Sequence, residues 1–235
     1  KQTNTAAFTA PTITNTNTWP ADDFQPANPS VLSVRPDRPR LFAPQYKWDA
    51  LPDLIRKDPY LKGWNDTIFG NATAYAASPP VAYFMDGDSG ILDNAREIKQ
   101  RIKAFAYAYR LTKDTKWSDR AWAEIQFVSN TVPQQDVATN SWTLLLERIR
   151  ERAHAFGPAT DRWNTGHFLD AAEFSAAFGI AYDWFYDVFT DDQKSQMRAT
   201  LIQYGLQPGL NVFTGTATYG WWATGINGNW NCVCN

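Results

Sequence analysis

The segment from Gly90 to Thr112 carries the clearest structural signal in the sequence. Its apolar residues recur at steps of three and four, with Lys and Arg between them, which is the spacing of one face of an α-helix. These residues are Ile91, Ala95, Ile98, Ile102, Phe105 and Tyr109. A segment of the same period, from about Lys116 to Asn130, follows after a short break. The two segments together predict an antiparallel helical hairpin.

The same reasoning predicts helices along most of the chain after residue 37. The expected helices are Tyr46 to Lys57, Tyr60 to Ala77, one marked by Trp142, Leu145, Leu146, Ile149 and Ala153, and His167 to about Val188. Thr190 and Gln193 form a capping box that opens a further helix. Gly205-Leu206 is expected to end that helix with a left-handed stop.

The arrangement of these segments indicates the fold class. No segment alternates apolar and polar residues for long enough to predict a sheet of any size, so we expect an all-α protein. Repeated helical hairpins indicate an incomplete α/α toroid, with an open helical bundle as the alternative. The toroid domain is expected over residues 38–235. Because these helices are too few to close a double ring, the domain is expected to continue past Asn235.

The first 37 residues have a different character. They form a lead-in rich in Thr, Asn and Pro without periodicity, for which an extended conformation is expected. The chain begins at Lys1, without an initiating Met or an apolar signal segment, which is typical of a mature secreted protein. Two N-glycosylation sequons, at Asn65 and Asn71, agree with an extracellular location.

Charge and composition exclude several classes of partner. A net charge of −2 provides no positive field to gather nucleic acid, and no apolar run approaches the roughly 18 residues of a membrane span. We therefore predict no nucleic-acid or membrane partner. Two histidines and the pair Cys232 and Cys234 do not have the spacing of a metal site, so no metal or other cofactor is predicted. A mutual disulfide would be strained across one intervening residue, which leaves free thiols or partners outside the chain.

Aromatic residues are unusually abundant. They make up 15% of the chain, including 11 Trp, which is more than a helical core needs. Their flat faces would suit the stacking of sugar rings, and the alternative is an unusually large core.

Three segments carry the strongest motifs. They are Trp163-Asn164-Thr165-Gly166-His167-Phe168-Leu169-Asp170, then Ala181-Tyr182-Asp183-Trp184, and finally Trp221-Trp222 followed by Asn227-Gly228-Asn229-Trp230-Asn231-Cys232-Val233-Cys234-Asn235. With the intervening turn Gly205-Leu206-Gln207-Pro208-Gly209-Leu210, their order and spacing resemble the heparinase II/III-like polysaccharide lyases. The resemblance covers about Arg38 to Asn235 and is concentrated from Trp163 onward.

The resemblance implies a toroidal enzyme that cleaves an anionic, uronate-containing polysaccharide by β-elimination. In that family an asparagine near this point serves the substrate carboxylate, and we carry its role onto Asn229 or Asn231. Neutral amide donors suit this task because they offset the charge that develops when the proton on C5 leaves. The family's tyrosine and histidine come from further along the chain, so a missing C-terminal part is an expected partner. The remaining predicted substrate contacts are Trp163, His167, Trp221, Trp222, Asn227 and Trp230.

Each motif also has a structural interpretation. His167 opens a predicted helix with Asp170 three residues on, which is typical of a satisfied histidine at a helix start. The asparagines of the last segment suit turns as well as a cleft.

Three other functions fit the same scaffold. A toroidal glycoside hydrolase would need two carboxylates across a cleft, and the available residues are Asp170, Glu173, Asp183 and Asp187. A uronate epimerase shares the removal of the C5 proton. A glycan-binding helical module would stack sugars without catalysing a reaction.

Overall fold

The computed structural model describes residues 18–24, 34–81, 90–129, 163–217, 219–225 and 228–234. The regular elements in these ranges are helical, as predicted. They are α1 (Gln45–Lys57), α2 (Pro59–Ala77), α3 (Leu92–Thr112), α4 (Lys116–Ser129), α6 (Phe168–Trp184), α7 (Asp191–Leu201), the π-helical segment η2 (Ile202–Leu206), α8 (Gln207–Phe213), the 3-10 turn η3 (Trp221–Ala223) and α9 (Trp230–Cys234). None of these helices combines the length and the apolar character needed to cross a membrane.

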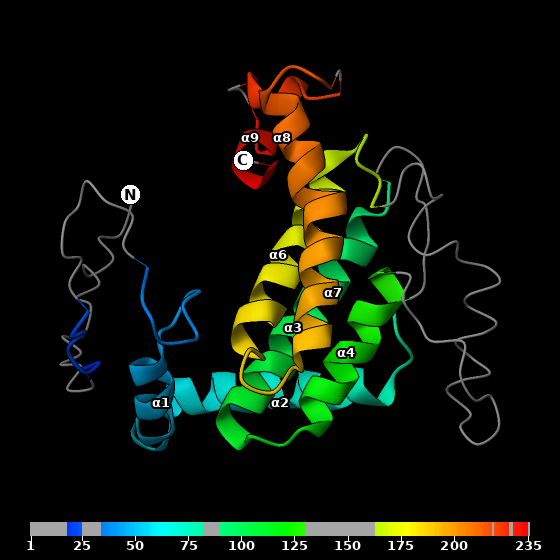
Figure 1. The fold of residues 1–235 in the computed structure, drawn as a ribbon. Coiled ribbons are helices and arrows are strands. Elements are labelled where there is room, and N and C mark those ends of the chain that lie inside the picture. The colour runs from blue at the N-terminus through cyan, green and yellow to red at the C-terminus, as the bar shows by residue number, and fades with distance from the viewer. Residues whose placement is uncertain are drawn as a thin grey trace, which may run out of the picture.

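Two helical hairpins form the body of the molecule (Figure 1). Helix α3 pairs with α4, and α6 pairs with α7. Helices α3 and α6 lie side by side and run parallel, because Ile91 contacts Asp170 at their first turns and Arg110 contacts Asp187 near their ends. The apolar residues of α3 form one buried face of the helix, as their spacing predicts, since Ile98, Ile102 and Phe105 are all at most 1% exposed.

Helices α1 and α2 cover one end of the body, and α2 crosses below α3 in Figure 1. Trp48 of α1 meets Trp184 edge-on, with the ring centroids 4.8 Å apart. Both helices were predicted within one residue of their observed bounds. Asp58 lies between them and caps α2, accepting hydrogen bonds from the backbone N–H groups of Tyr60 and Leu61.

Helix α6 is the central helix. Twelve of its 17 residues are buried. It ends at Trp184, four residues before the predicted Val188. Beyond that point the chain forms further turns that bring Phe185 and Phe189 into the core.

The carboxyl end of α6 anchors the segment before α1. Asp183 is buried and accepts hydrogen bonds from the Arg38 guanidinium at 2.8 Å and from the backbone N–H groups of Arg40 and Leu41. Trp184 Nε1 donates to the carbonyl oxygen of Leu41 at 3.0 Å. The second sequence motif is therefore used to attach residues 38–42 to the helical body.

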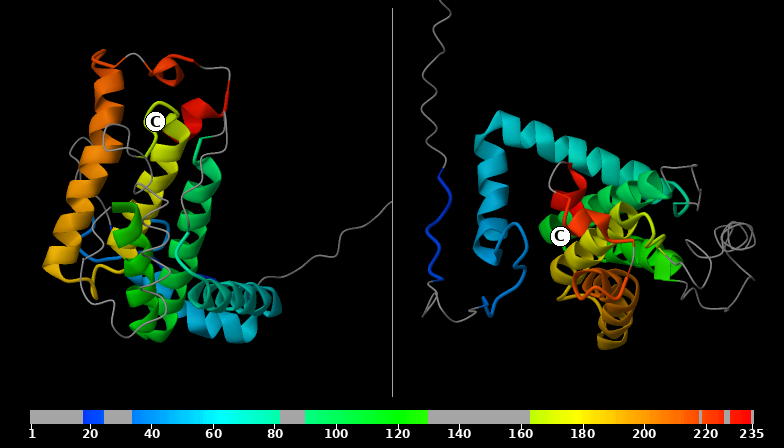
Figure 2. Two further views of the ribbon diagram at one scale, coloured as in Figure 1. Left: turned by 90° about the vertical axis from the view of Figure 1, so that its right-hand side faces the viewer. Right: turned by 90° about the horizontal axis from the view of Figure 1, so that it is seen from above.

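The predicted stop at Gly205-Leu206 is wrong. The chain passes from α7 through η2 into α8 without leaving helical backbone angles, and Figure 2 shows the three as one continuous rod. Pro208 has no N–H to donate to the carbonyl four residues earlier, and the wider π-helical turn just before it accommodates that loss. Gly205 instead allows close packing, because a Cβ there would lie 2.3 Å from Ser175 Oγ on α6.

Several predictions lie outside the described residues. They are the helix marked by Trp142 to Ala153, most of the 1–37 lead-in, and the predicted substrate contact Asn227.

Candidate functional site

Two of the three sequence motifs meet at the end of the body where α6 begins. The loop at residues 163–167 leads into α6, and η3 and α9 lie against the same end, beside the end of α8 (Figures 1 and 2). The imidazole of His167 and the indole of Trp230 meet edge-on, with centroids 4.7 Å apart and an interplanar angle of 83°. Residues more than sixty positions apart in the sequence therefore share one surface.

His167 occupies the N-cap position of α6. Its Nδ1 lies 2.8 Å from Asp170 Oδ1, and its side chain is 23% exposed. Within the ranges that the structure describes, no hydrogen bond reaches Nε2 of the ring. One ring nitrogen is thus held by a carboxylate.

Asp170 is fully buried and joins three segments of the chain. Its second oxygen, Oδ2, accepts hydrogen bonds from Asn164 Nδ2 at 2.7 Å and from the backbone N–H of Ile91 at 2.8 Å. Burial raises the pKa of the Asp170 carboxyl above its ordinary value, while the hydrogen bonds from His167, Asn164 and Ile91 act in the opposite direction.

Gly90 makes this arrangement possible. Its φ of +63° is a conformation that favours glycine, and a Cβ there would lie 2.5 Å from Asp170 Oδ2 and 2.4 Å from Asn164 Nδ2. Asn164 also adopts a left-handed conformation, with φ of 51°. Gly90 was not among the predicted site residues, and Asp170 was considered only as a partner of His167 and as a carboxylate of the hydrolase alternative. Only the i, i+3 spacing of His167 and Asp170 was visible in the sequence.

The paired tryptophans point to opposite sides. Trp221 is 58% exposed and lies 4.9 Å from Trp230, measured between ring centroids. Trp222 is fully buried and stacks on Phe168 at 4.7 Å. Trp221 and Trp230 therefore present aromatic surface at the site, whereas Trp222 supports it from the core.

Trp163 also belongs to the core rather than to the surface. It is fully buried, its Nε1 donates to the carbonyl oxygen of Val128 at 3.1 Å, and its ring lies 5.2 Å from that of Phe174. A sugar ring has no access to this indole, so the predicted substrate contact at Trp163 is not retained. Trp222 is set aside for the same reason.

The two asparagines assigned to the substrate carboxylate differ in exposure. Asn229 is exposed at the start of α9, and its backbone carbonyl accepts hydrogen bonds from the N–H groups of Cys232 and Val233. Asn231 is half-buried and donates from Nδ2 to the carbonyl oxygen of Trp222 at 3.2 Å. Asn229 is the amide that faces solvent.

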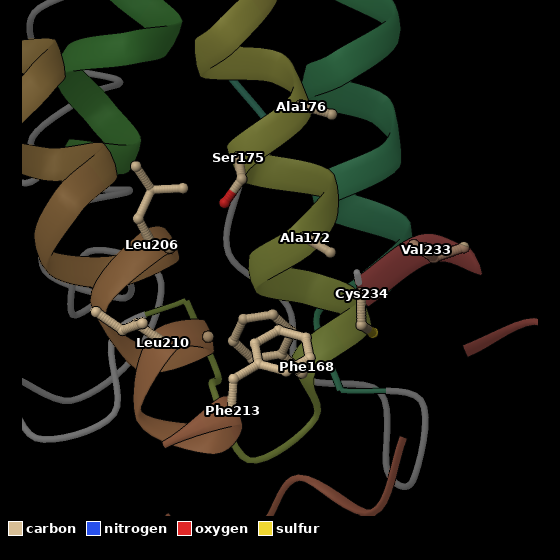
Figure 3. A pocket seen from close by; sticks show the side chains of 11 residues that line it. Phe168, Ala172, Ser175, Ala176, Leu206, Leu210, Phe213, Val233 and Cys234 are labelled. Carbon is tan, nitrogen blue, oxygen red and sulfur yellow. The ribbon is translucent and has the colours of Figure 1, made fainter. Parts of the chain in front are cut away.

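An apolar groove of about 490 Å³ lies next to this surface, between α6 and the rod of α7 and α8. Figure 3 shows its lining, with side chains from α6, from the rod and from α9. Leu206, Leu210 and Phe213 form one wall, and Val233 and Cys234 close one end. None of the predicted substrate contacts within the described ranges lines this groove.

The carboxylates required by the hydrolase alternative do not face one another. Asp170 and Asp183 lie 13 positions apart on α6, which is about 20 Å along a helix. A glycosidase pair is separated by roughly 5–10 Å. The other carboxylates form ion pairs: Glu173 with Lys99, Asp183 with Arg38, and Asp187 with Arg110 and Lys113.

The predicted glycosylation sites lie on α2, away from this surface. Asn71 is exposed, whereas Asn65 is half-buried and its Oδ1 accepts a hydrogen bond from the Tyr107 hydroxyl at 3.0 Å.

The part of the chain that the structure describes contains no group of three or more metal-ligating side chains. Cys232 is exposed and Cys234 is buried, and both are free thiols.

No protein-family model matches the sequence, and no curated protein matches it significantly.

Proposed function

We propose that this protein is a secreted polysaccharide lyase that cleaves a uronate-containing anionic polysaccharide by β-elimination. The observation that carries the proposal is the meeting of the His167 loop with the Trp221–Cys234 segment. It brings together an oriented imidazole, the exposed indole of Trp221, the half-buried indole of Trp230 and a solvent-facing amide.

Each of these groups meets a requirement of the reaction. Trp221 and Trp230 offer flat faces on which sugar rings stack. Asn229 offers a neutral N–H donor to the uronate carboxylate, and that donor offsets the charge of the developing enolate. Asn231 is the weaker assignment for this role because its amide already donates to the Trp222 carbonyl. A missing C-terminal part would supply further groups.

The finer architecture that we propose is an α/α toroid. Its support is the repeat of hairpins in which α3 runs parallel to α6. The apolar groove between α6 and the rod, the two members of the second hairpin, is the place where a following hairpin would pack.

The test is product analysis with the intact protein on alginate, glucuronan and glycosaminoglycans. A lyase produces unsaturated uronate ends, which absorb in the ultraviolet. Reducing ends without a double bond would instead indicate a hydrolase, epimers without chain scission an epimerase, and binding without turnover a glycan-binding module. Any of these three results would overturn the proposal.

The Asn229→Ala variant tests whether this amide takes part in the reaction. We expect its rate to fall on the order of 10²-fold, as when one donor to a developing oxyanion is removed. The matched control is Asn71→Ala, which removes an exposed amide from α2 and should leave the rate unchanged. An unchanged rate in Asn229→Ala would remove this residue from the site.

A further inference from the structure

The contacts of His167 suggest how its two ring nitrogens divide their tasks. A neutral imidazole carries one proton, and the partner of one nitrogen decides which nitrogen carries it. Asp170 Oδ1 lies 2.8 Å from Nδ1, and a carboxylate in that position accepts a proton donated by Nδ1. The lone pair is then on Nε2.

The surroundings of Asp170 fix the direction of this hydrogen bond. The Oδ2 atom is already occupied by two donors, Asn164 Nδ2 and the Ile91 N–H. Two donors on Oδ2 favour the ionised form of the carboxyl group, and an ionised carboxylate can only accept, so Oδ1 accepts the hydrogen bond from Nδ1. Because Asp170 is fully buried, water does not compete for these bonds.

We infer that Asp170 is a positioning residue that keeps the proton of His167 on Nδ1 and thereby makes Nε2 the basic nitrogen of this imidazole, whose ring meets that of Trp230. This inference rests on the proposed function for the identity of the proton that Nε2 accepts, but the state of the imidazole itself does not depend on that function.

In the proposed reaction Nε2 accepts the proton from C5 of the uronate. The C5–H electron pair becomes the π bond between C4 and C5, and the C4–O4 bond breaks with its electron pair on oxygen. O4 takes a proton from solvent water, and the imidazolium of His167 releases its proton to solvent. Atoms and charge are balanced without an oxidant or a reductant.

The direct test is the state of the ring in the whole protein, read from long-range ¹H–¹⁵N correlation spectra at about pH 8, above the ordinary histidine pKa of about 6.5. The sequence has two histidines, His154 and His167, so a His154→Gln variant assigns the signals. We expect a protonated Nδ1 and an unprotonated Nε2. A ring of His167 with its proton on Nε2 would overturn the inference, and this measurement requires no variant of Asp170.

Asp170→Asn supplies the second measurement. An asparagine retains one oxygen for Asn164 and Ile91 and turns an N–H group toward Nδ1, which moves the ring proton to Nε2. The matched control is Asp183→Asn, which alters the other deeply buried aspartate of α6 and should leave the His167 spectrum unchanged. Equal shifts in both variants would indicate a general disturbance of α6 and would contradict the inference.

Kinetics separate the inference from the proposed function. Asp170→Asn and His167→Gln should each lower kcat by a factor on the order of 10² or more, while KM changes little. A full kcat in His167→Gln, in a protein whose lyase activity has been established, would overturn the role of Nε2. If unsaturated products never form but the ring has its proton on Nδ1, the lyase proposal fails and the role of Asp170 stands.

Discussion

Gly205 and Ser175 are so close that a methyl group on the glycine would lie 2.3 Å from the serine hydroxyl oxygen. The contact joins η2 to α6 at the wall of the apolar groove. A glycine inside a helix is normally less favourable than alanine by about 1 kcal/mol, so its presence here reflects packing.

Gly205→Ala should therefore destabilise the protein, even though alanine is the better helix former. Overpacking of this kind costs about 1–3 kcal/mol. Gly63→Ala is the matched control, because Gly63 lies inside α2 with no atom within 4 Å of the added Cβ. Chemical denaturation should show a lower unfolding free energy for the first variant and a slightly higher one for the second. Stabilisation by both substitutions would show that η2 can move away from α6.

The adjacent tryptophans 221 and 222 should respond differently to truncation. Trp222→Ala removes a fully buried indole and should cost about 3–5 kcal/mol of unfolding free energy. Trp221→Ala removes an exposed one and should leave the melting temperature nearly unchanged while weakening substrate binding about tenfold. Thermal unfolding and KM measurements distinguish the two effects. Unaltered binding in Trp221→Ala would remove the exposed indole from the site.

The two thiols should react with iodoacetamide at different rates. Burial, assisted by the nearby charge of Asp170, raises the pKa of Cys234 to about 11. At pH 8 its thiolate fraction is lower than that of an ordinary cysteine by a factor on the order of 10². Cys232 is exposed and should be alkylated first, as peptide mass analysis would show. Equal rates in the folded protein would contradict the burial of Cys234.

The same shift predicts a loss of stability in alkaline solution. The unfolded chain gives up its thiol proton near pH 8.5, before the folded chain does, so the unfolding free energy should fall between about pH 8.5 and about 11. Cys234→Ala should remove this part of the pH dependence. An identical pH dependence in the variant and the original protein would show that other groups cause it.

The groove wall should behave as exposed apolar surface in the 235-residue chain. Leu206 and Leu210 are each more than half exposed. A double substitution to glutamine should reduce the binding of a hydrophobic dye with little change in melting temperature. In a longer chain whose next hairpin covers the groove, the same double substitution should lower the melting temperature. A strong loss of stability in the 235-residue chain would show that these leucines already serve its core.

The sequence predicts the helices well because their signals are local. The period of α3 and the capping box at Thr190 are both visible within one or two turns, and both are confirmed. The stop at Gly205 was wrong because glycine signals either a chain reversal or a close approach. Only the position of Ser175, thirty residues earlier, distinguishes the two.

The site could be predicted only in part for the same reason. The motifs marked the two segments that meet, but nothing in their sequences separated Trp163 and Trp222, which lie inside the core, from Trp221, which lies outside it. The spacing of His167 and Asp170 indicated a pair. The bond from Ile91 and the space at Gly90 come from about eighty residues away and leave no local pattern.

Helix α6 is held at both ends by buried aspartates that bind other parts of the chain, Asp170 at the start and Asp183 near the finish. A residue inserted between them would rotate one carboxylate by about 100° relative to the other. Only one of the two aspartates could then accept its hydrogen bonds from the segment that it binds. The number of residues between Asp170 and Asp183 is consequently fixed in this protein. Related proteins should tolerate substitutions between these two positions far more readily than insertions or deletions.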